Sequence, residues 1–240
     1  KVSQFRADDA LLTGRDVSAL VAVADGHRMQ AEAAAAYEAL RSDAAAAGFE
    51  LAIASSYRSF ERQCLIWNGK ARGERTVHDD AGCPIAIAQM SPHELLHAIL
   101  RFSALPGTSR HHWGTDIDVY DAAALPEGYV LQLSPAEVAA GGMFDALHCW
   151  LDQRMAADES RGFYRPYAAD TGGVAPERWH LSYAPLARLC EPGPGKTALR
   201  AAWDSGAGGE PLALRDAIEG ELEAILDRYV RVAPGWCPGP

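Results

Sequence analysis

The sequence predicts an α+β fold, in which irregularly spaced helices accompany a few short strands. Three observations predict it. Helix caps and helical periodicity recur along the chain, the apolar alternation of β-strands is confined to short runs, and the two kinds of segment do not alternate as a wound parallel sheet requires. A length of 240 residues suits one domain with insertions, or at most two small ones.

Helices are indicated by their caps and by their periodicity. The Ala-rich first segment ends at Gly48, and glycine is common just after the last turn of a helix. Two capping boxes, Ser91–Glu94 and Ser134–Glu137, each carry a proline in the first helical position. The last segment has an amphipathic period. The expected helices are 28–47, 60–69, 92–102, 135–155 with an interruption at Gly141-Gly142, and 214–230.

Three short runs have the pattern of β-strands. They are 49–54, 116–120 and 178–183. The segment 73–89 lacks a clear period and is expected to form an irregular loop. Pro192-Gly193-Pro194-Gly195 marks a turn-rich break before the last helices.

Composition and charge limit the class of protein. Hydrophobic residues make up 48% of the chain and charged residues 22%, as in a packed globular protein. No apolar run approaches the roughly 20 residues that a membrane helix needs, so we expect a soluble chain without a membrane span. The formal net charge of -10 disfavours nucleic acid as a partner, because phosphate backbones bind basic surfaces.

The cysteines do not suggest a metal knuckle. There are five of them, irregularly spaced and without a C-x-x-C pair. Their odd number argues against a complete disulfide framework, although one or two bridges remain an alternative. We interpret them as small buried hydrophobic residues. The five are Cys64, Cys83, Cys149, Cys190 and Cys237.

The run from Ser109 to Asp118 carries the strongest chemical signal. It places His111 and Asp118 on either side of Gly114, which favours a turn between a loop and a strand. On such a strand, Asp116 and Asp118 share one face and their apolar neighbours the other. Buried carboxylates need a partner. A histidine, a carboxylate and a second histidine are typical protein ligands of a catalytic zinc ion.

A second block, from Glu177 to His180, supplies the missing groups. His180 is a candidate for the second imidazole ligand, and Glu177 for the carboxylate that acts as base for a zinc-bound water. The competing interpretation is that His180 is an ordinary core histidine and Glu177 a surface carboxylate.

A rival motif also requires an explanation. His93-Glu94-Leu95-Leu96-His97 fits the H-E-x-x-H signature of zinc proteases. Glu94, however, is already explained as the third residue of a capping box, the motif lies in the first helical turns, and no H-x-x-G-x-x-H extension follows. We interpret the motif as coincidental and predict that His93→Ala does not remove the catalytic zinc.

The blocks together resemble a known family. Ser109-x-His111-x-x-Gly114-x-x-x-Asp118, Glu177-x-Trp179-His180 and Tyr57-Arg58-Ser59-x-x-x-Gln63 resemble, in this order, the motifs of the M15-type zinc D,D-peptidases. These include D-alanyl-D-alanine dipeptidases and carboxypeptidases of vancomycin resistance, L,D-carboxypeptidases and phage endolysins. The resemblance implies the fold shared with the hedgehog signalling domain, a small antiparallel sheet flanked by helices. We expect one domain over 1–240, with core motifs at 50–185 and a helical extension at 186–240.

The resemblance also implies roles for single residues. His111, Asp118 and His180 would bind Zn²⁺, Glu177 would act as general base and then general acid, and Arg58 would face the scissile carbonyl oxygen. Ser109, Gln63 and Tyr57 would bind the substrate. The family often has a small residue where Asp116 stands, so this carboxylate would either support a ligand or alter the metal affinity.

The implied activity is zinc-dependent D-alanyl-D-alanine carboxypeptidase, which removes the C-terminal D-alanine from peptidoglycan stem peptides or muropeptides. We expect a monomeric bacterial protein of the cytoplasm or the periplasm. Two alternatives stay open: an L,D-carboxypeptidase or endolysin-type peptidase of the same family, and a zinc-containing module that binds peptidoglycan or a protein without cleaving it.

Overall fold

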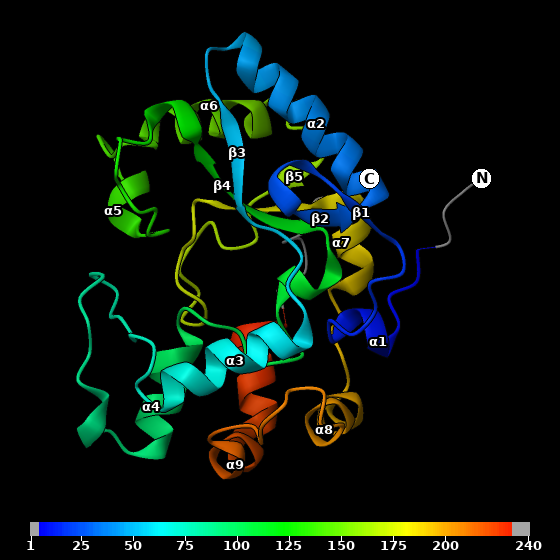
Figure 1. The fold of residues 1–240 in the computed structure, drawn as a ribbon, viewed down its shortest axis with the longest axis vertical. Coiled ribbons are helices and arrows are strands. Elements are labelled where there is room, and N and C mark those ends of the chain that lie inside the picture. The colour runs from blue at the N-terminus through cyan, green and yellow to red at the C-terminus, as the bar shows by residue number, and fades with distance from the viewer. Residues whose placement is uncertain (1–4, 232–240) are drawn as a thin grey trace.

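The computed structural model describes residues 5–231 and confirms the α+β prediction (Figure 1). Its helices are α1 (Asp9–Leu12), α2 (Ala31–Ala46), α3 (Phe60–Ala71), α4 (Pro92–Leu100), α5 (Pro135–Val138), α6 (Asp145–Ala156), α7 (Ala184–Cys190), α8 (Lys196–Asp204) and α9 (Arg215–Ile225), which continues as a π-helix over Leu226–Val230. Its strands are β1 (Leu20–Ala22), β2 (Arg28–Gln30), β3 (Leu51–Ser55), β4 (Asp116–Asp121), β5 (Phe163–Tyr164) and β6 (His180–Tyr183).

The central element is a four-stranded antiparallel sheet in the order β3-β4-β6-β5. Asp118 on β4 lies directly opposite His180 on β6, and Asp116 lies opposite Ser182. Ile117 and its partner on β6 point to the other face, because side chains alternate along a strand. The register therefore collects polar groups on one face of the sheet and apolar groups on the other.

The apolar face packs against α2 and α6. Ile117 and Leu181 share a buried cluster with Tyr37 and Leu40 of α2 and with Leu147 of α6. Figure 1 shows these two helices on one side of the sheet and α3, α4, α8 and α9 on the other. The polar face is thus turned towards the second group of helices.

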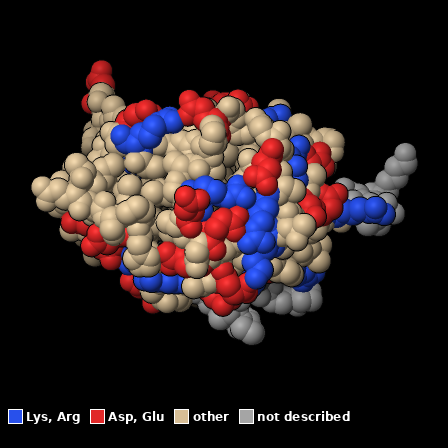
Figure 2. All heavy atoms as spheres, turned by 90° about the horizontal axis from the view of Figure 1, so that it is seen from below, with Lys and Arg blue, Asp and Glu red and all other residues tan. Residues whose placement is uncertain are grey.

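That second group of helices has its own apolar cluster. Trp67 of α3, Leu96 of α4, Leu199 of α8 and Ile218 of α9 are fully buried in it. Seen from below, the outer surface of this layer mixes acidic and basic side chains (Figure 2). Ion pairs join α8 and α9, for example Arg200 with Glu219 at 2.7 Å. None of the helices in the described part of the chain has the length and apolarity that crossing a bilayer requires.

Three sequence predictions need correction. Residues 28–30 form a strand and not the start of a helix, because they pair with β1. The strand expected from 178 begins at His180, because Glu177–His180 is a turn closed by a 3.1 Å bond from the His180 N–H to the Glu177 carbonyl. The cysteines are not uniformly buried, since Cys83 and Cys149 are exposed while Cys64 and Cys190 are buried; Cys237, for which burial was also predicted, lies outside the described residues.

Candidate metal centre

The chain turn before β4 positions the first imidazole. His111 lies in a 3-10 turn over Arg110–Trp113, and Gly114 follows in the left-handed conformation with φ 72°. A Cβ on Gly114 would come within 2.6 Å of Leu20 Cδ2 and 3.3 Å of the Gln30 backbone nitrogen. The position therefore needs glycine, both because its φ is positive and because a side chain would clash with its neighbours. The turn brings His111 back over β4.

His111, Asp118 and His180 meet on the polar face of the sheet. His111 Nε2 lies 3.3 Å from Asp118 Oδ2, and His180 Nδ1 lies 3.4 Å from Asp118 Oδ1. All three residues are at most 5% exposed. A tetrahedral metal ion with bonds of about 2.0–2.1 Å separates its ligand atoms by about 3.4 Å. The spacing of the three side chains therefore matches three ligands around one ion.

Hydrogen bonds orient both imidazole rings for this arrangement. His111 Nδ1–H donates to the Ser56 carbonyl at 2.9 Å, which leaves Nε2 facing Asp118. His180 Nε2–H donates to Asp116 Oδ2 at 2.8 Å, which leaves Nδ1 facing Asp118. Which nitrogen of each ring carries the hydrogen is assigned from the hydrogen-bond partners of the two nitrogens. Such outer hydrogen bonds are typical of histidines that bind metal.

The electrostatics of the centre favour a positive charge between the carboxylates. Asp118 Oδ1 is buried and has no hydrogen-bond partner among residues 5–231. Burial raises the pKa of Asp118, but His111, His180 and Arg58 together outweigh this and hold it below its ordinary value. Burial likewise opposes a charged His180, yet its bonds to Asp116 and Glu177 raise its pKa to about 10. A divalent metal ion would replace that proton and satisfy the buried oxygen.

Asp116, whose role the sequence left open, is the support of His180. Arg110 Nε donates to its Oδ2 at 2.7 Å, and Thr115 and Ser182 each donate to its Oδ1 at 2.8 Å. Arg110 is itself 5% exposed and lies over the Trp113 ring at 4.5 Å. Although burial works against the charged form, Arg110 keeps the pKa of Asp116 below its ordinary value. The carboxylate therefore stays charged and fixed beside His180.

Glu177 lies at the edge of the centre. Its Oε2 is 3.3 Å from His180 Nδ1, and its side chain is 13% exposed, so it reaches both the ligand set and solvent. Its backbone N–H donates to the Tyr167 carbonyl at 2.9 Å. Lys70 is another neighbour: burial lowers the Lys70 pKa to about 8, and the charge of Glu177 opposes that shift.

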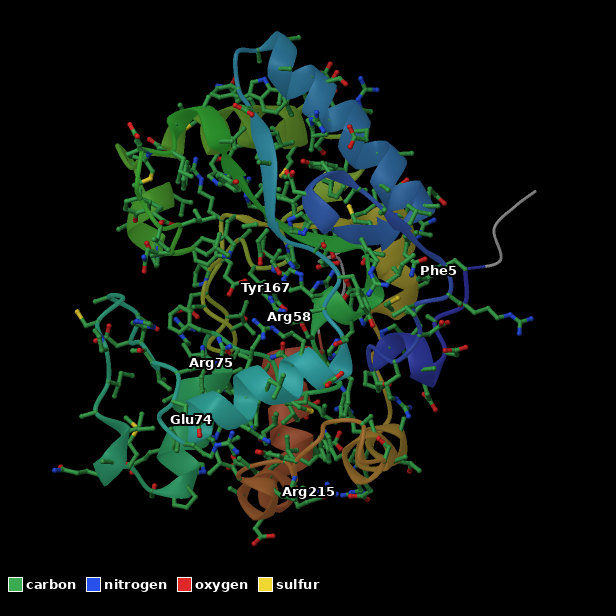
Figure 3. All side chains as sticks on the ribbon, in the orientation of Figure 1. Phe5, Arg58, Glu74, Arg75, Tyr167 and Arg215 are labelled. Carbon is green, nitrogen blue, oxygen red and sulfur yellow. The ribbon has the colours of Figure 1, made fainter. Side chains whose placement is uncertain are left out.

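Arg58 enters the same space from the junction of β3 and α3 (Figure 3). Its guanidinium donates to Gln63 Oε1 and to Ser55 Oγ, both at 3.0 Å, and its backbone N–H donates to the His111 carbonyl at 3.0 Å. Burial lowers the Arg58 pKa, while Asp118 and Glu177 support its charge. Arg58 is therefore a fixed cation next to the centre.

The other predicted substrate residues lie in different settings. Gln63 is buried and donates to the Ala104 carbonyl at 2.7 Å, which fixes the amide that accepts from Arg58. Ser109 is 2% exposed and directly precedes the turn that carries His111. The Tyr57 hydroxyl, by contrast, donates to the Gly14 carbonyl at 2.8 Å. Tyr57 thus ties the N-terminal segment to the loop that precedes α3.

His112 has both of its ring nitrogens occupied elsewhere. Its Nδ1 lies 2.7 Å from the Arg58 carbonyl, and its Nε2 accepts from the Gly107 N–H at 3.1 Å. Burial lowers the His112 pKa to about 3. A neutral imidazole with both nitrogens bonded in this way has no free nitrogen for a metal.

Sequence reasoning missed two neighbours of the centre. The Tyr167 ring meets the His180 ring edge-on, with centroids 5.1 Å apart, and Figure 3 shows its place in the middle of the molecule. Lys70 stands near Glu177 at the end of α3. Neither residue lies in a motif. Only the tertiary packing reveals that they are neighbours of the centre. Tyr167, for example, belongs to an irregular segment more than ten positions before His180, where no sequence pattern marks it.

Comparison with known proteins gives matches of three kinds. The sequence model of one family, VanY, described as D-alanyl-D-alanine carboxypeptidase, matches residues 26–186. An uncharacterized protein of Haemophilus influenzae is 46% identical over 99 residues, which are 40% of this chain and 68% of the relative. A second uncharacterized protein of Haemophilus influenzae is 34% identical over 128 residues, which are 52% of this chain and 92% of the relative.

Two solved structures illustrate the third kind of match. VanYB in complex with D-Alanine-D-Alanine is 21% identical, with a TM-score of 0.49, and the match covers 91% of this chain and 92% of that one. The LdcB LD-carboxypeptidase is 22% identical, with a TM-score of 0.46, and the match covers 84% of this chain and 78% of that one.

Proposed function

This chain belongs to the VanY family of D-alanyl-D-alanine carboxypeptidases, and we propose that it is a zinc-dependent enzyme that releases the C-terminal D-alanine from peptidoglycan stem peptides. One observation carries the proposal: a buried His-Asp-His set with metal spacing lies within reach of both a carboxylate, Glu177, and a fixed cation, Arg58. A binding module would need the ligand set but neither of the other two groups.

We propose His111, Asp118 and His180 as the three zinc ligands. Their donor atoms are two imidazole nitrogens and a carboxylate oxygen, a set that suits zinc and leaves a fourth position for water. A bound zinc ion supplies a Lewis acid that lowers the pKa of water towards about 7. The hydrogen bonds from His111 to Ser56 and from His180 to Asp116 hold the rings in place before the ion arrives.

Glu177 is proposed as the group that moves the proton. Its carboxylate takes a proton from the attacking water as the water oxygen bonds to the peptide carbonyl carbon. When the C–N bond breaks, Glu177 returns the proton to the departing amine, so the products are a shortened peptide and free D-alanine. Arg58 stabilises the negative charge that develops on the carbonyl oxygen. Ser109 and Gln63 are proposed to lie near the terminal carboxylate of the substrate.

The first experiment identifies the bond that is cut. The zinc-loaded protein is incubated with muropeptide tetrapeptides and pentapeptides, and the products are analysed by mass spectrometry. We expect loss of one D-alanine from the pentapeptide. Cleavage of the tetrapeptide at its L,D bond, with the pentapeptide left intact, would contradict D,D specificity. No product from either substrate would contradict an enzymatic role.

The second experiment tests the role of Glu177. Glu177→Ala should lower the rate of D-alanine release at least 100-fold while the bound zinc is retained, because the base is removed and the ligands are not. Glu127→Ala, which changes an exposed glutamate elsewhere, is the control and should keep wild-type activity. Hydrolysis at the wild-type rate in Glu177→Ala, or loss of its zinc, would refute the assignment.

A further inference from the structure

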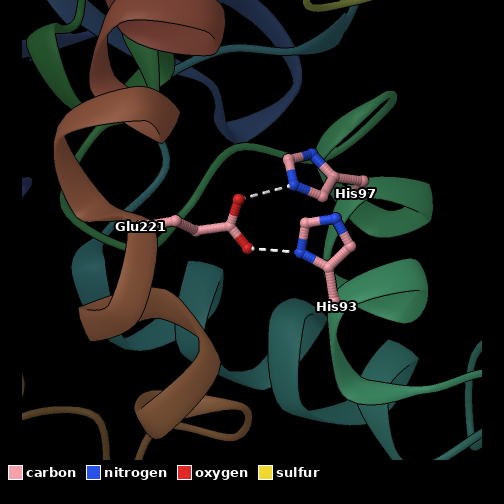
Figure 4. A group of neighbouring side chains, drawn as sticks. All are labelled: His93, His97 and Glu221. Atoms are coloured by element: carbon pink, nitrogen blue, oxygen red, sulfur yellow. Dashed lines mark hydrogen bonds and ion pairs between the residues drawn. The ribbon is translucent and has the colours of Figure 1, made fainter.

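A second cluster of metal-binding side chains lies between α4 and α9, away from the candidate centre. His93 and His97 lie one turn apart on α4, and Glu221 of α9 reaches both of them (Figure 4). His93 Nδ1 is 2.7 Å from Glu221 Oε1, and His97 Nε2 is 2.9 Å from Glu221 Oε2. The two histidines are those of the H-E-x-x-H motif, and the third group comes from a helix more than 120 positions along the chain.

The orientation of His97 resembles that of the histidines at the candidate centre. Its Nδ1 lies 2.8 Å from the Tyr229 hydroxyl, so both of its nitrogens have polar partners. With an ion at Nε2, Nδ1–H would donate to that hydroxyl, as His111 Nδ1–H donates to the Ser56 carbonyl. An outer hydrogen bond that fixes the ring of a metal-binding histidine is typical of zinc sites.

The backbone of α9 adjusts at the residue that supplies the carboxylate. Glu221 has φ -138° and ψ 24°, which lie outside helical values. Its neighbours Ile218 and Leu222 are buried against α4. The side chains of Glu221 and His97 are 22% and 21% exposed, and that of His93 is 68% exposed. The cluster therefore lies at the surface, where an ion can enter, while the helices beneath it are held by the apolar core.

We propose that His93, His97 and Glu221 form a second zinc site that fastens α9 to α4. Two imidazole nitrogens and one carboxylate oxygen are a zinc donor set. The N···O distances of 2.7 and 2.9 Å, which involve the two different oxygens of Glu221, would have to widen by about 0.5 to 0.7 Å to reach the roughly 3.4 Å that separates ligand atoms around a tetrahedral ion. The exposed side chain of His93 has the freedom to make this movement.

The role of this second site is structural and not catalytic. Glu94, the residue that would act as base in an H-E-x-x-H protease, accepts from the Ser91 N–H and from Ser91 Oγ, both at 2.8 Å. Its carboxylate is therefore used in capping α4. The ion would instead join a helix inside the family match at 26–186 to one that lies beyond it. The site goes beyond the proposed function and does not depend on it.

Zinc stoichiometry tests the proposal directly. The zinc-saturated protein is freed of unbound metal by equilibrium dialysis, and its zinc content is measured per chain. We expect two zinc ions in the wild type, one in His97→Ala, one in Glu221→Gln, one in His180→Ala, and none in the His180→Ala/Glu221→Gln double variant. Glu94→Gln and His78→Ala, which change the motif glutamate and an exposed histidine outside both clusters, should keep two.

Thermal unfolding supplies a second readout that does not depend on activity. Zinc should raise the melting temperature of His180→Ala, in which the second site alone is left, and should leave that of the double variant unchanged. A wild type that binds one zinc ion, with the same content in Glu221→Gln, overturns the proposal. A loss of one ion in Glu221→Gln supports the second site whatever the zinc content of His180→Ala is. The proposal of the second site and the proposal of the catalytic centre are therefore tested independently of each other.

Discussion

At the scale of single residues, the proposed zinc centre depends on how each imidazole is turned. Each ring has two nitrogens, and the partner of one decides what the other can bind. Ser56 accepts from His111 and Asp116 accepts from His180, so the free nitrogen of each ring faces Asp118. Asp116 is held in turn by Arg110. The ligand geometry is therefore set by residues that never touch the metal.

Asp116→Asn tests this dependence. The substitution removes the charge that orients His180, and we expect zinc affinity at the centre to fall about 10- to 100-fold, as for other outer partners of metal-binding histidines. The measurement is competition with a chelator for zinc in a Glu221→Gln background, which removes the second cluster. Asp121→Asn, at the far end of β4, is the matched control: Asp121 is also buried but accepts from the Glu50 N–H at 3.0 Å. Equal zinc affinities in the two variants would contradict the role of Asp116.

At the scale of elements, the turn into β4 is the feature on which the centre depends most. Gly114 has positive φ and close neighbours, whereas Gly26 has φ 79° and nothing within 4 Å of an added Cβ. The two glycines therefore separate the cost of the backbone conformation from the cost of a clash.

We expect Gly114→Ala to lose more stability than Gly26→Ala. Both variants carry the conformational cost of about 1–2 kcal/mol for a side chain at positive φ. Gly114→Ala also drives its Cβ against Leu20 and the backbone of Gln30, and it should weaken zinc binding because His111 moves with the turn. Urea unfolding measures the difference in unfolding free energy. Equal losses in the two variants would show that the space around Gly114 does not matter.

Helix α6 carries a buried histidine whose charge state links stability to pH. His148 is fully buried, its Nδ1 lies 3.2 Å from Arg165 Nη2, and its Nε2 has no hydrogen-bond partner within residues 5–231. Burial first, and then the charge of Arg165, lower its pKa to about 3. The folded chain therefore keeps His148 neutral at a pH where the unfolded chain, with a pKa near 6.5, takes up a proton.

The sign of the effect follows from that difference in pKa. The stabilising contribution is complete above about pH 6.5 and is lost as the pH falls towards 3, at up to about 1.4 kcal/mol per pH unit. His148→Gln should flatten the decline in unfolding free energy between these values, as measured by urea titrations at a series of pH values. His78→Gln changes an exposed histidine and should follow the wild type. Parallel curves for wild type and His148→Gln would contradict the prediction.

At the scale of the whole molecule, the centre lies between two apolar clusters. The apolar cluster between the sheet, α2 and α6 fixes β4 and β6. The apolar cluster of α3, α4, α8 and α9 fixes α3, which directly follows Arg58. The C-terminal helices belong to the second cluster, with Ile218 and Leu222 packed among side chains of α3 and α4. We therefore expect residues up to the end of α9 to unfold together with the core, as one domain.

Ile218→Ala tests this expectation. Ile218 is fully buried, so its truncation should cost about 2–5 kcal/mol of unfolding free energy. If the chain is one cooperative unit, urea transitions followed by circular dichroism and by residual hydrolysis should move to lower urea by the same amount. A shift in the circular dichroism transition alone, with hydrolysis lost at the wild-type urea concentration, would show that the C-terminal helices form a separate unit.

The sequence by itself determined the features that depend on neighbouring residues. Capping boxes and Gly114 set where helices begin and where the chain turns, because they act through local backbone geometry and hydrogen bonds. The motif spacing therefore indicated His111, Asp118 and His180 as candidate ligands, and the structure brings these three side chains together. The tertiary structure alone decided that Asp118 lies opposite His180, that Asp116 supports His180, and that Glu221 joins His93 and His97. These contacts join segments more than sixty positions apart, and the pairing of strands and the packing of helices that create them leave no local pattern in the chain.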